Sequence, residues 1–221
     1  MGRKIYIIIV AGGSGSRMGA SLPKQFLELD GVPILQRTIE KFVSAVPEAK
    51  IITVLPKSHI GTWKDMCIAN ALDCPQVIVE GGITRFHSVQ NALKKVPDGA
   101  IVMVHDGVRP LVSVGLIRSL VEKMQTERAL VPVVPVVDTL AADDGTYLDR
   151  RRIRAVQTPQ VFFSEDIKEA YTRAYDISFT DDASVLMKTG IPVTFVEGER
   201  FNIKITTPED LVLAESIRGL D

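Results

Sequence analysis

Residues 5–19 read IYIIIVAGGSGSRMG, an apolar run that ends at Val10 and passes directly into a loop with four glycines, two serines and Arg17. A short apolar run of this kind is typical of a strand that is covered on both faces of a parallel sheet. In open α/β sheets the loop after the first strand commonly binds phosphate, because glycine lets backbone N–H groups approach an anion closely. The stretch therefore predicts an α/β fold with an anion-binding loop.

The rest of the chain alternates short strand-like runs with segments of helical period. Further strands are expected at 51–55, 77–79, 101–104, 130–137 and 193–196, and helices at 34–46, 60–71, 85–96, 116–125, 165–175, 183–188 and 209–217. This alternation predicts right-handed βαβ units on a mainly parallel, Rossmann-like sheet with helices on both faces. We expect a single domain over residues 1–221.

Residues 138–160 break the alternation. Asp143-Asp144-Gly145 is a hairpin turn signal, and no helical period fits the residues around it. The segment also holds too few apolar residues to build a core of its own. We therefore expect a β-arm that projects from the domain and packs on a partner subunit.

Composition excludes several classes of partner. Lysine and arginine number 26 against 27 aspartate and glutamate, so the net charge of −1 provides no general attraction for nucleic acid or an anionic membrane. The 2 cysteines have no metal-site spacing, and no apolar run reaches the length of a signal peptide or a membrane span. These features predict a cytoplasmic protein without nucleic-acid or membrane partners.

The glycine loop fits neither of two common nucleotide motifs. No Gly-Lys-Ser/Thr follows it, which excludes a P-loop, and Met18 stands where the dinucleotide fingerprint needs its third glycine. The loop instead carries its own cation, Arg17, with Lys24 shortly after it, and such a pair suits a polyphosphate. The alternative is a glycine-rich turn whose two cations are solvated.

Three further motifs are candidates for the same site. Asp106 and Arg109 follow the strand at 101–104, where they could position a metal-bound phosphate and bind a second anion, or form an Asp-Gly turn with an incidental arginine. His105, directly before Asp106, is expected to be structural. Lys204 falls on an apolar strand, where an ammonium group is costly unless it reaches an anion or the surface.

A second glycine-rich junction, Gly81-Gly82, opens the helix at 85–96. Its backbone could pass close to a flat base, with Ser88 as a hydrogen-bonding group. A helix start capped by Thr84 explains the same residues without a ligand. Residues 180–182 are expected to start a helix and to do nothing more.

Together the motifs resemble the nucleotidyltransferases that activate sugar or polyol phosphates, in particular the methylerythritol phosphate cytidylyltransferases of the non-mevalonate isoprenoid pathway. The matching segments, in chain order, are AGGSGSRM at 11–18, PKQ at 23–25, GGITRFHSV at 81–89, HDGVRP at 105–110, DT at 138–139, TPQ at 158–160, TDDAS at 180–184 and NIKITTPEDL at 202–211. The resemblance implies a fold of the nucleotide-diphospho-sugar transferase type, a homodimer with embracing arms, and a Mg²⁺-dependent reaction of CTP that releases pyrophosphate.

The resemblance also implies roles for individual residues. Arg17, Lys24 and Lys204 would be catalytic, and Asp106 would be the metal ligand. The residues implied for CTP are Ala11, Gly12, Gly13, Gly15, Gly81, Gly82 and Ser88. Those implied for methylerythritol phosphate are Asp106, Arg109, Thr139 and Lys204, with Arg150 and Thr158 reaching in from the partner's arm.

Two positions depart from the family's pattern, which usually has a small or acidic residue where Ile83 stands and often a basic one where Val137 stands.

A pentitol phosphate cytidylyltransferase, such as a ribitol 5-phosphate enzyme, is an alternative, because that sister family shares the glycine loop and the segments around Asp106 and Lys204. A nucleotide-binding module without catalytic activity is an alternative of another class. For either enzyme, the substrate phosphate is already a nucleophile at neutral pH, so positioning and charge neutralisation should supply most of the rate without a general base.

Overall fold

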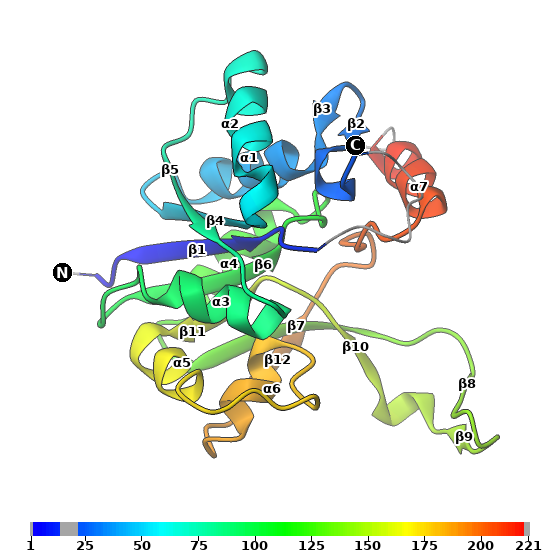
Figure 1. Ribbon diagram of the computed structural model, residues 1–221. Coiled ribbons are helices and arrows are strands. Elements are labelled where there is room, and N and C mark those ends of the chain that lie inside the picture. Colours follow the sequence, from blue (N-terminus) through cyan, green and yellow to red (C-terminus); the bar gives the residue numbers. More distant parts are fainter. Residues whose placement is uncertain (1, 14–21, 219–221) are drawn as a thin grey trace.

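The computed structural model describes residues 2–13 and 22–218, and an eight-stranded sheet forms its centre (Figure 1). β5, β4, β1 and β6 are parallel, β11 runs antiparallel between β6 and β7, and both β10 and β12 pair with β7. In pairing order the strands are β5 (Gln76–Glu80), β4 (Lys50–Leu55), β1 (Ile5–Val10), β6 (Ile101–Asp106), β11 (Gln160–Phe163), β7 (Ala129–Pro135) and β10 (Arg154–Val156). The eighth strand, β12 (Thr194–Glu197), lies off this path and pairs with β7.

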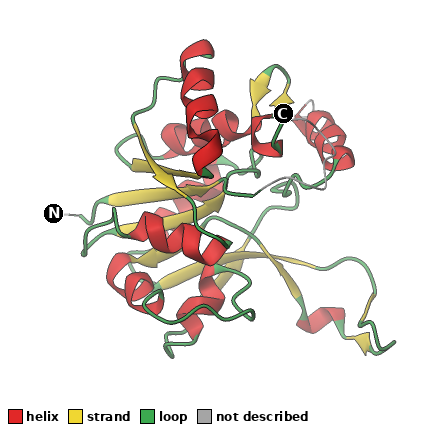
Figure 2. Ribbon diagram, viewed as in Figure 1, coloured by secondary structure: helices red, strands yellow, loops and turns green. Residues whose placement is uncertain are grey.

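Helices cover both faces of this sheet, as the alternating pattern predicted (Figure 2). Because successive side chains of a strand point to opposite faces, β1 sends Ile7 and Ile9 into one core and Tyr6 and Ile8 into the other. The first core is closed by α1 (Ile34–Ala45), α2 (Ile60–Ala69) and α4 (Val114–Lys123), and the second by α3 (Arg85–Leu93), α5 (Ser164–Ala170) and α6 (Asp182–Met187).

A smaller cluster lies where the chain leaves the main sheet. The hairpin of β2 (Glu28–Leu29) and β3 (Val32–Pro33) packs with the last helix, α7 (Pro208–Arg218), around buried Leu29, Ile205 and Ala214. Short 3-10 turns lie at η2 (Lys24–Phe26) and η3 (Lys57–His59). Within the described residues, no helix is both long and apolar enough to cross a membrane.

The helix boundaries agree with the periodicity except where caps decide them. α4 begins at Val114, two residues earlier than predicted, because the Ser113 side chain accepts a hydrogen bond from the Leu116 N–H group. α5 ends at Ala170 rather than at 175. The strand β11 was not predicted.

The segment predicted as an arm over 138–160 divides into two parts. β8 (Leu140–Ala141) and β9 (Tyr147–Leu148) form the expected hairpin, which projects from the body and continues into η4 (Arg150–Arg152) (Figure 1). From Arg154 the chain returns to the main sheet as β10, and Thr158 and Gln160 are buried. The predicted boundary at 160 is therefore wrong, because residues 154–160 complete the sheet beside β7 and β6.

Candidate functional site

A cavity of about 440 Å³ opens where β1 and β6 end and α3 begins. Parallel strands place their carboxyl ends at one edge of the sheet, so motifs far apart in the sequence meet there. The structure brings together most of the residues that the sequence singled out. The lining residues are Val10, Ala11, Gly12, Gly13, Lys24, Gln25, Gly82, Ile83, Thr84, Arg85, Ser88, Asp106, Val108 and Lys204.

The start of the first glycine loop, at residues 11–13, is held in place from both sides. The Ala11 N–H group donates to the Val54 carbonyl oxygen at 2.9 Å, which continues the β1–β4 pairing beyond the strand. The buried Gln25 side chain, on η2, donates from Nε2 to the carbonyl oxygens of Ala11 at 2.9 Å and Gly13 at 3.5 Å. Lys24, the neighbour of Gln25, lines the cavity beside this loop. Two other predicted site residues, Gly15 and Arg17, lie outside the described residues.

The second glycine pair packs tightly against the start of α3. The Gly82 N–H group donates to Ser88 Oγ at 3.1 Å, and that hydroxyl donates to the Thr84 carbonyl oxygen at 3.0 Å. A Cβ atom on Gly82 would lie 2.3 Å from the Cβ atom of His87, so only glycine fits at this position. Ser88 thus shapes the loop directly, and Ile83, 97% exposed, stands at the rim of the cavity.

Asp106, at the end of β6, is surrounded by three cations. Its carboxylate oxygens lie 3.4 Å from Arg85 Nε, 3.4 Å from Arg109 Nε and 3.0 Å from Lys204 Nζ. Burial alone would raise the pKa of Asp106, but the charges of Arg85, Lys204 and Arg109 outweigh it and hold the pKa well below its ordinary value. Positive charge therefore exceeds negative charge at this edge of the sheet, and an anion from solvent can neutralise the excess.

Sequence reasoning assigned no role to Arg85 or Asp182. Arg85 Nη2 lies 2.7 Å from the fully buried Asp182 carboxylate, which also accepts a hydrogen bond from the Tyr171 hydroxyl at 2.5 Å. The expectation that residues 180–182 only start a helix is therefore wrong, although Asp181 does cap α6. The sequence signal that could have indicated this ion pair was Arg85, in the first helical turn after Gly81-Gly82. Its partner, Asp182, lies 97 residues further along the chain.

Arg109 and Lys204 are joined through the segment that leads to α7. Arg109 Nη1 donates to the Asn202 carbonyl oxygen at 2.7 Å, and Asn202 Nδ2 donates to the Thr158 carbonyl oxygen at 2.8 Å. Lys204 lies two residues after Asn202, on a stretch without strand structure. The prediction that Lys204 lies on a strand is therefore wrong. The Ile205 N–H group donates to the Val108 carbonyl oxygen at 2.9 Å, and this bond sets Lys204 beside Asp106.

Three predicted substrate contacts lie elsewhere. Thr139 and Arg150 are exposed on the projecting segment, where Arg150 donates to the Val137 carbonyl oxygen. Thr158 was expected to reach in from a partner's arm, but it is buried in the body of its own chain. Its hydroxyl accepts a hydrogen bond from the Asp106 N–H group at 3.1 Å, and so it supports Asp106 from below.

His105 is structural, as predicted. Burial lowers the pKa of His105 to about 3, and its ring nitrogens lie 3.0 Å from Thr158 Oγ1 and 3.2 Å from the Arg109 carbonyl oxygen. A histidine that stays neutral and hydrogen-bonded at neutral pH is poorly suited to exchange protons with a substrate. The charged residues around Asp106 are thus suited to binding and orienting anions rather than to exchanging protons.

The acidic groups of the cavity are few. Asp106 is the one carboxylate among its described lining residues. Across the described ranges, 2–13 and 22–218, no three histidine, cysteine, aspartate or glutamate side chains are grouped as a metal site. Any metal ion in this cavity would therefore depend on ligands from a substrate.

Comparisons with known sequences point to one family. Residues 5–219 match the sequence model of the family described as 2-C-methyl-D-erythritol 4-phosphate cytidylyltransferase. The chain is 47% identical over 213 residues to the protein of that name from Phocaeicola vulgatus, with 95% of this chain and 97% of that protein covered. The corresponding protein from Porphyromonas gingivalis is 46% identical over 219 residues, at 97% and 98% coverage.

Comparisons with solved structures point to the same family. The crystal structure of 4-diphosphocytidyl-2C-methyl-D-erythritol synthase from Anaerococcus prevotii matches with a TM-score of 0.83 and 30% identity, over 99% of this chain and 100% of that one. The 2-C-methyl-D-erythritol 4-phosphate cytidylyltransferase of Thermus thermophilus matches with a TM-score of 0.73 and 34% identity, over 98% of both chains.

Proposed function

The chain belongs to the 2-C-methyl-D-erythritol 4-phosphate cytidylyltransferase family, and from this we propose how its residues carry out the reaction. The enzyme transfers the cytidylyl group of CTP to 2-C-methyl-D-erythritol 4-phosphate and releases pyrophosphate, in the non-mevalonate route to isoprenoids. The observation that carries the residue assignments is the convergence of Arg85, Arg109 and Lys204 on Asp106, beside two glycine loops.

CTP occupies the 440 Å³ cavity in this proposal. The backbone of Ala11, Gly12 and Gly13 and the ammonium group of Lys24 hold the triphosphate, with Gly15 and Arg17 contributing from the same loop. The second glycine loop receives the cytosine and ribose, where Gly81, Gly82 and Ser88 leave room for a flat base. Gln25 fixes the carbonyl groups of Ala11 and Gly13 before the nucleotide binds, so these residues need little ordering on binding.

Asp106 would hold Mg²⁺ together with the phosphates of the nucleotide. A magnesium ion is commonly held by one or two carboxylates together with substrate phosphates, and the single carboxylate of Asp106 fits that arrangement. When bound, Mg²⁺ would withdraw charge from the phosphates and favour attack at the α-phosphorus. Lys204 and Arg109, which contact Asp106 in the structure, are then available to the second substrate.

Lys204 and Arg109 bind the phosphate of methylerythritol phosphate and align it with the α-phosphorus of CTP. This phosphate attacks the α-phosphorus as a dianion. The bond between the α-phosphorus and the oxygen that bridges it to the β-phosphorus breaks, and pyrophosphate leaves with the electron pair. No proton has to be removed, which is compatible with the neutral, buried His105. Lys24 and Arg17 stabilise the charge that accumulates on the α-phosphate and the leaving group.

A homodimer completes the site. The projecting segment exposes apolar surface, with Tyr147 at 77% exposure and Val137, directly before the segment, at 63%. Such apolar surface on an extended hairpin is typical of a subunit contact. We assign this segment to the partner subunit's site, where Thr139 and Arg150 reach the substrate phosphate.

Pyrophosphate release by the purified enzyme with CTP and Mg²⁺ tests this assignment. Release is expected with methylerythritol 4-phosphate and not with ribitol 5-phosphate, and release with ribitol 5-phosphate alone would contradict the substrate. Lys24→Ala and Lys204→Ala should each lower turnover by about 100-fold, the effect of losing one preorganised charge donor. Lys64→Ala, an exposed lysine on α2, is the control and should retain normal turnover. Near-normal turnover in either cavity variant would remove that lysine from the mechanism.

A further inference from the structure

The two oxygen atoms of the Asp106 carboxylate face different partners. Oδ1 lies 3.4 Å from Arg85 Nε, whereas Oδ2 lies 3.4 Å from Arg109 Nε and 3.0 Å from Lys204 Nζ. Arg109 and Lys204 have roles in the proposed reaction, as ligands of the second substrate's phosphate, whereas Arg85 has none. Arg85 nevertheless lines the nucleotide cavity, at the first residue of α3. Among the described residues, it is the one cation that contacts Oδ1 of Asp106.

Arg85 is anchored on a second carboxylate, which is fully buried. Arg85 Nη2 lies 2.7 Å from Asp182 Oδ2, and Asp182 Oδ1 accepts a hydrogen bond from the Tyr171 hydroxyl at 2.5 Å. If Asp182 lost this cation, its charge would stay buried without compensation, which is strongly unfavourable. Burial alone would lower the pKa of Arg85, but the charges of Asp182 and Asp106 outweigh it and hold that pKa well above its ordinary value. The pair with Asp182 is thus a strong restraint on the Arg85 guanidinium.

Asp182 is in turn fixed relative to the strand that carries Asp106. It is the first residue of α6, and Gln160 on β11 holds the start of this helix. The Gln160 Oε1 atom accepts a hydrogen bond from the Ala183 N–H group at 2.9 Å. β11 pairs with β6, the strand that ends at Asp106. The sheet and α6 together therefore set where Arg85 meets Asp106.

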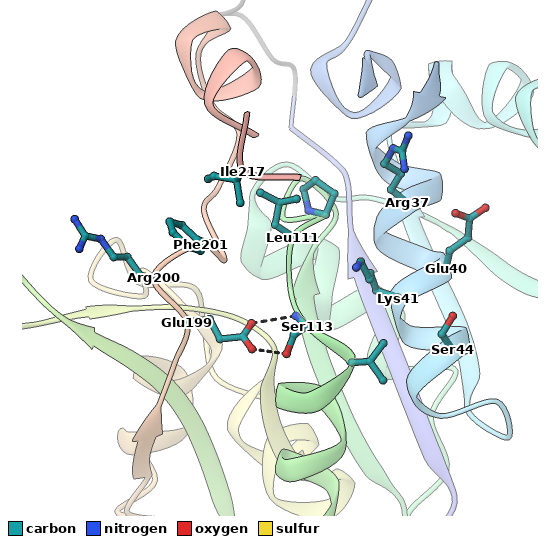
Figure 3. A pocket seen from close by; sticks show the side chains of 12 residues that line it. Arg37, Glu40, Lys41, Ser44, Leu111, Ser113, Glu199, Arg200, Phe201 and Ile217 are labelled. Atoms are coloured by element: carbon teal, nitrogen blue, oxygen red, sulfur yellow. Dashed lines mark hydrogen bonds between the residues drawn. The ribbon is translucent and has the colours of Figure 1, made fainter. Parts of the chain in front are cut away.

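The segments that carry the other two cations border a hollow in the protein. A second and larger cavity, of about 700 Å³, shares no lining residue with the nucleotide site (Figure 3). Its walls include Leu111, close to Arg109 in the chain, and Phe201, close to Lys204. Atoms that line a cavity have fewer packing partners than atoms of a filled core. The Lys204 side chain is also 40% exposed, so Lys204 can leave Oδ2 of Asp106 far more easily than Arg85 can leave a buried carboxylate.

We propose that Arg85 is a positioning residue for the cytidylyl transfer. Bound to Asp182, it holds Oδ1 of Asp106 in place, while Oδ2 exchanges its cations for partners that arrive with the substrates. The nitrogen atoms of a guanidinium lie in one rigid plane, so the contact of Nη2 with Asp182 also sets the direction of Nε toward Asp106. A carboxylate that could turn freely would keep Arg109 and Lys204 to itself, and the phosphate of the second substrate would lose them.

Steady-state kinetics of the full-length Arg85→Lys enzyme test this role, which rests on the proposed function. Lysine keeps the positive charge but presents one donor group in place of a planar fork, so it cannot hold both carboxylates in this arrangement. The kcat/KM for methylerythritol phosphate should fall by about tenfold or more, the effect of a misplaced reacting group, with the KM for CTP unchanged. Arg128→Lys is the matched control, because Arg128 forms an equally short ion pair with Asp166 outside the cavity, at 2.7 Å, and it should retain the wild-type values.

Two results would overturn the role of Arg85. An unchanged kcat/KM in Arg85→Lys would show that Asp106 needs no second anchor. A raised KM for CTP with a normal kcat would make Arg85 a direct ligand of the nucleotide instead. A wild-type enzyme that releases no pyrophosphate with methylerythritol phosphate would refute the proposed function, and this role with it, whereas an active wild type beside an unaltered Arg85→Lys would refute the role alone.

A paired variant separates positioning from stability. Arg85→Met combined with Asp182→Asn removes both charges, so that no buried carboxylate is left without its cation. The double variant should stay folded, as checked by the emission of buried Trp63, and should still show the tenfold or greater loss of kcat/KM. A folded double variant with wild-type kcat/KM would show that Arg85 only compensates the charge of Asp182, and would refute the proposal.

Discussion

Acidification from pH 7 to pH 5 should destabilise this enzyme mainly through His105. The side chain is fully buried on β6, packs edge-on against Phe42 and faces Thr158 and the Arg109 carbonyl oxygen. Burial lowers the pKa of His105 from 6.5 to about 3. Between these values the folded protein keeps the imidazole neutral, whereas the unfolded chain takes up a proton.

The sign and size of the effect follow from this difference. Because the unfolded state binds the extra proton, the free energy of unfolding falls as the pH drops below 6.5, and the loss levels off near pH 3. Linkage gives about 1.4 kcal/mol per pH unit well below 6.5, hence about 2 kcal/mol between pH 7 and pH 5. Asp106, whose pKa stays low because nearby cations outweigh its burial, loses its stabilising charge only in stronger acid.

Urea unfolding at pH 7 and pH 5 measures this loss. Trp63 is the only tryptophan and is fully buried, so its emission reports the unfolding of the core. His105→Gln retains hydrogen-bonding groups but cannot take up a proton, so the drop between the two pH values should shrink by about 2 kcal/mol. Val104→Ala, on the same strand, is a destabilised control that should keep the full drop. An equal drop in His105→Gln, or none in the wild type, would refute the reasoning.

Three other perturbations test separate parts of the structure. Gly82→Ala, whose Cβ atom would meet that of His87 at 2.3 Å, should force the loop to move and raise the KM for CTP about tenfold or more, and an unchanged KM would separate this loop from nucleotide binding. Arg85→Met and Asp182→Asn should show a coupling free energy of about 1–3 kcal/mol in a double-mutant unfolding cycle, whereas additive losses would contradict the ion pair. Tyr147→Asp on the exposed hairpin should shift sedimentation toward the monomer, and a dimer of normal strength would exclude this hairpin from the interface.

Much of the fold was predictable from local pattern. The apolar run at 5–10 and its successors identified the parallel strands, because strands covered on both faces lack a polar alternation. Thr84 caps α3 as predicted, whereas the cap of α4 at Ser113 was not predicted. The strand β11 and the return of the arm as β10 escaped this reasoning, since short strands depend on pairing with distant neighbours more than on their own residues.

Part of the candidate site was predictable in the same way. Lys24, Asp106 and Lys204 were singled out by residue type and position, and the structure brings all three to one cavity. The roles of Arg85 and Asp182 could not be predicted. Nothing in the local sequence distinguishes an arginine that forms a buried ion pair from one that is solvated. Thr158 was misplaced because the end of the arm could not be located without the sheet it rejoins.

By itself, then, the sequence determined the alternation of the parallel strands with helices, the faces they bury and the charged groups available to bind phosphate. These depend on hydrophobic periodicity, capping and residue chemistry, which are properties of neighbouring residues. Only the tertiary structure decided that Arg85, Arg109 and Lys204 share the carboxylate of Asp106, and that a second cavity lies against the segments that carry two of them. The physical reason is that ion pairs and cavities arise between segments far apart in the chain, whose separation is set by packing of the whole core rather than by local preference.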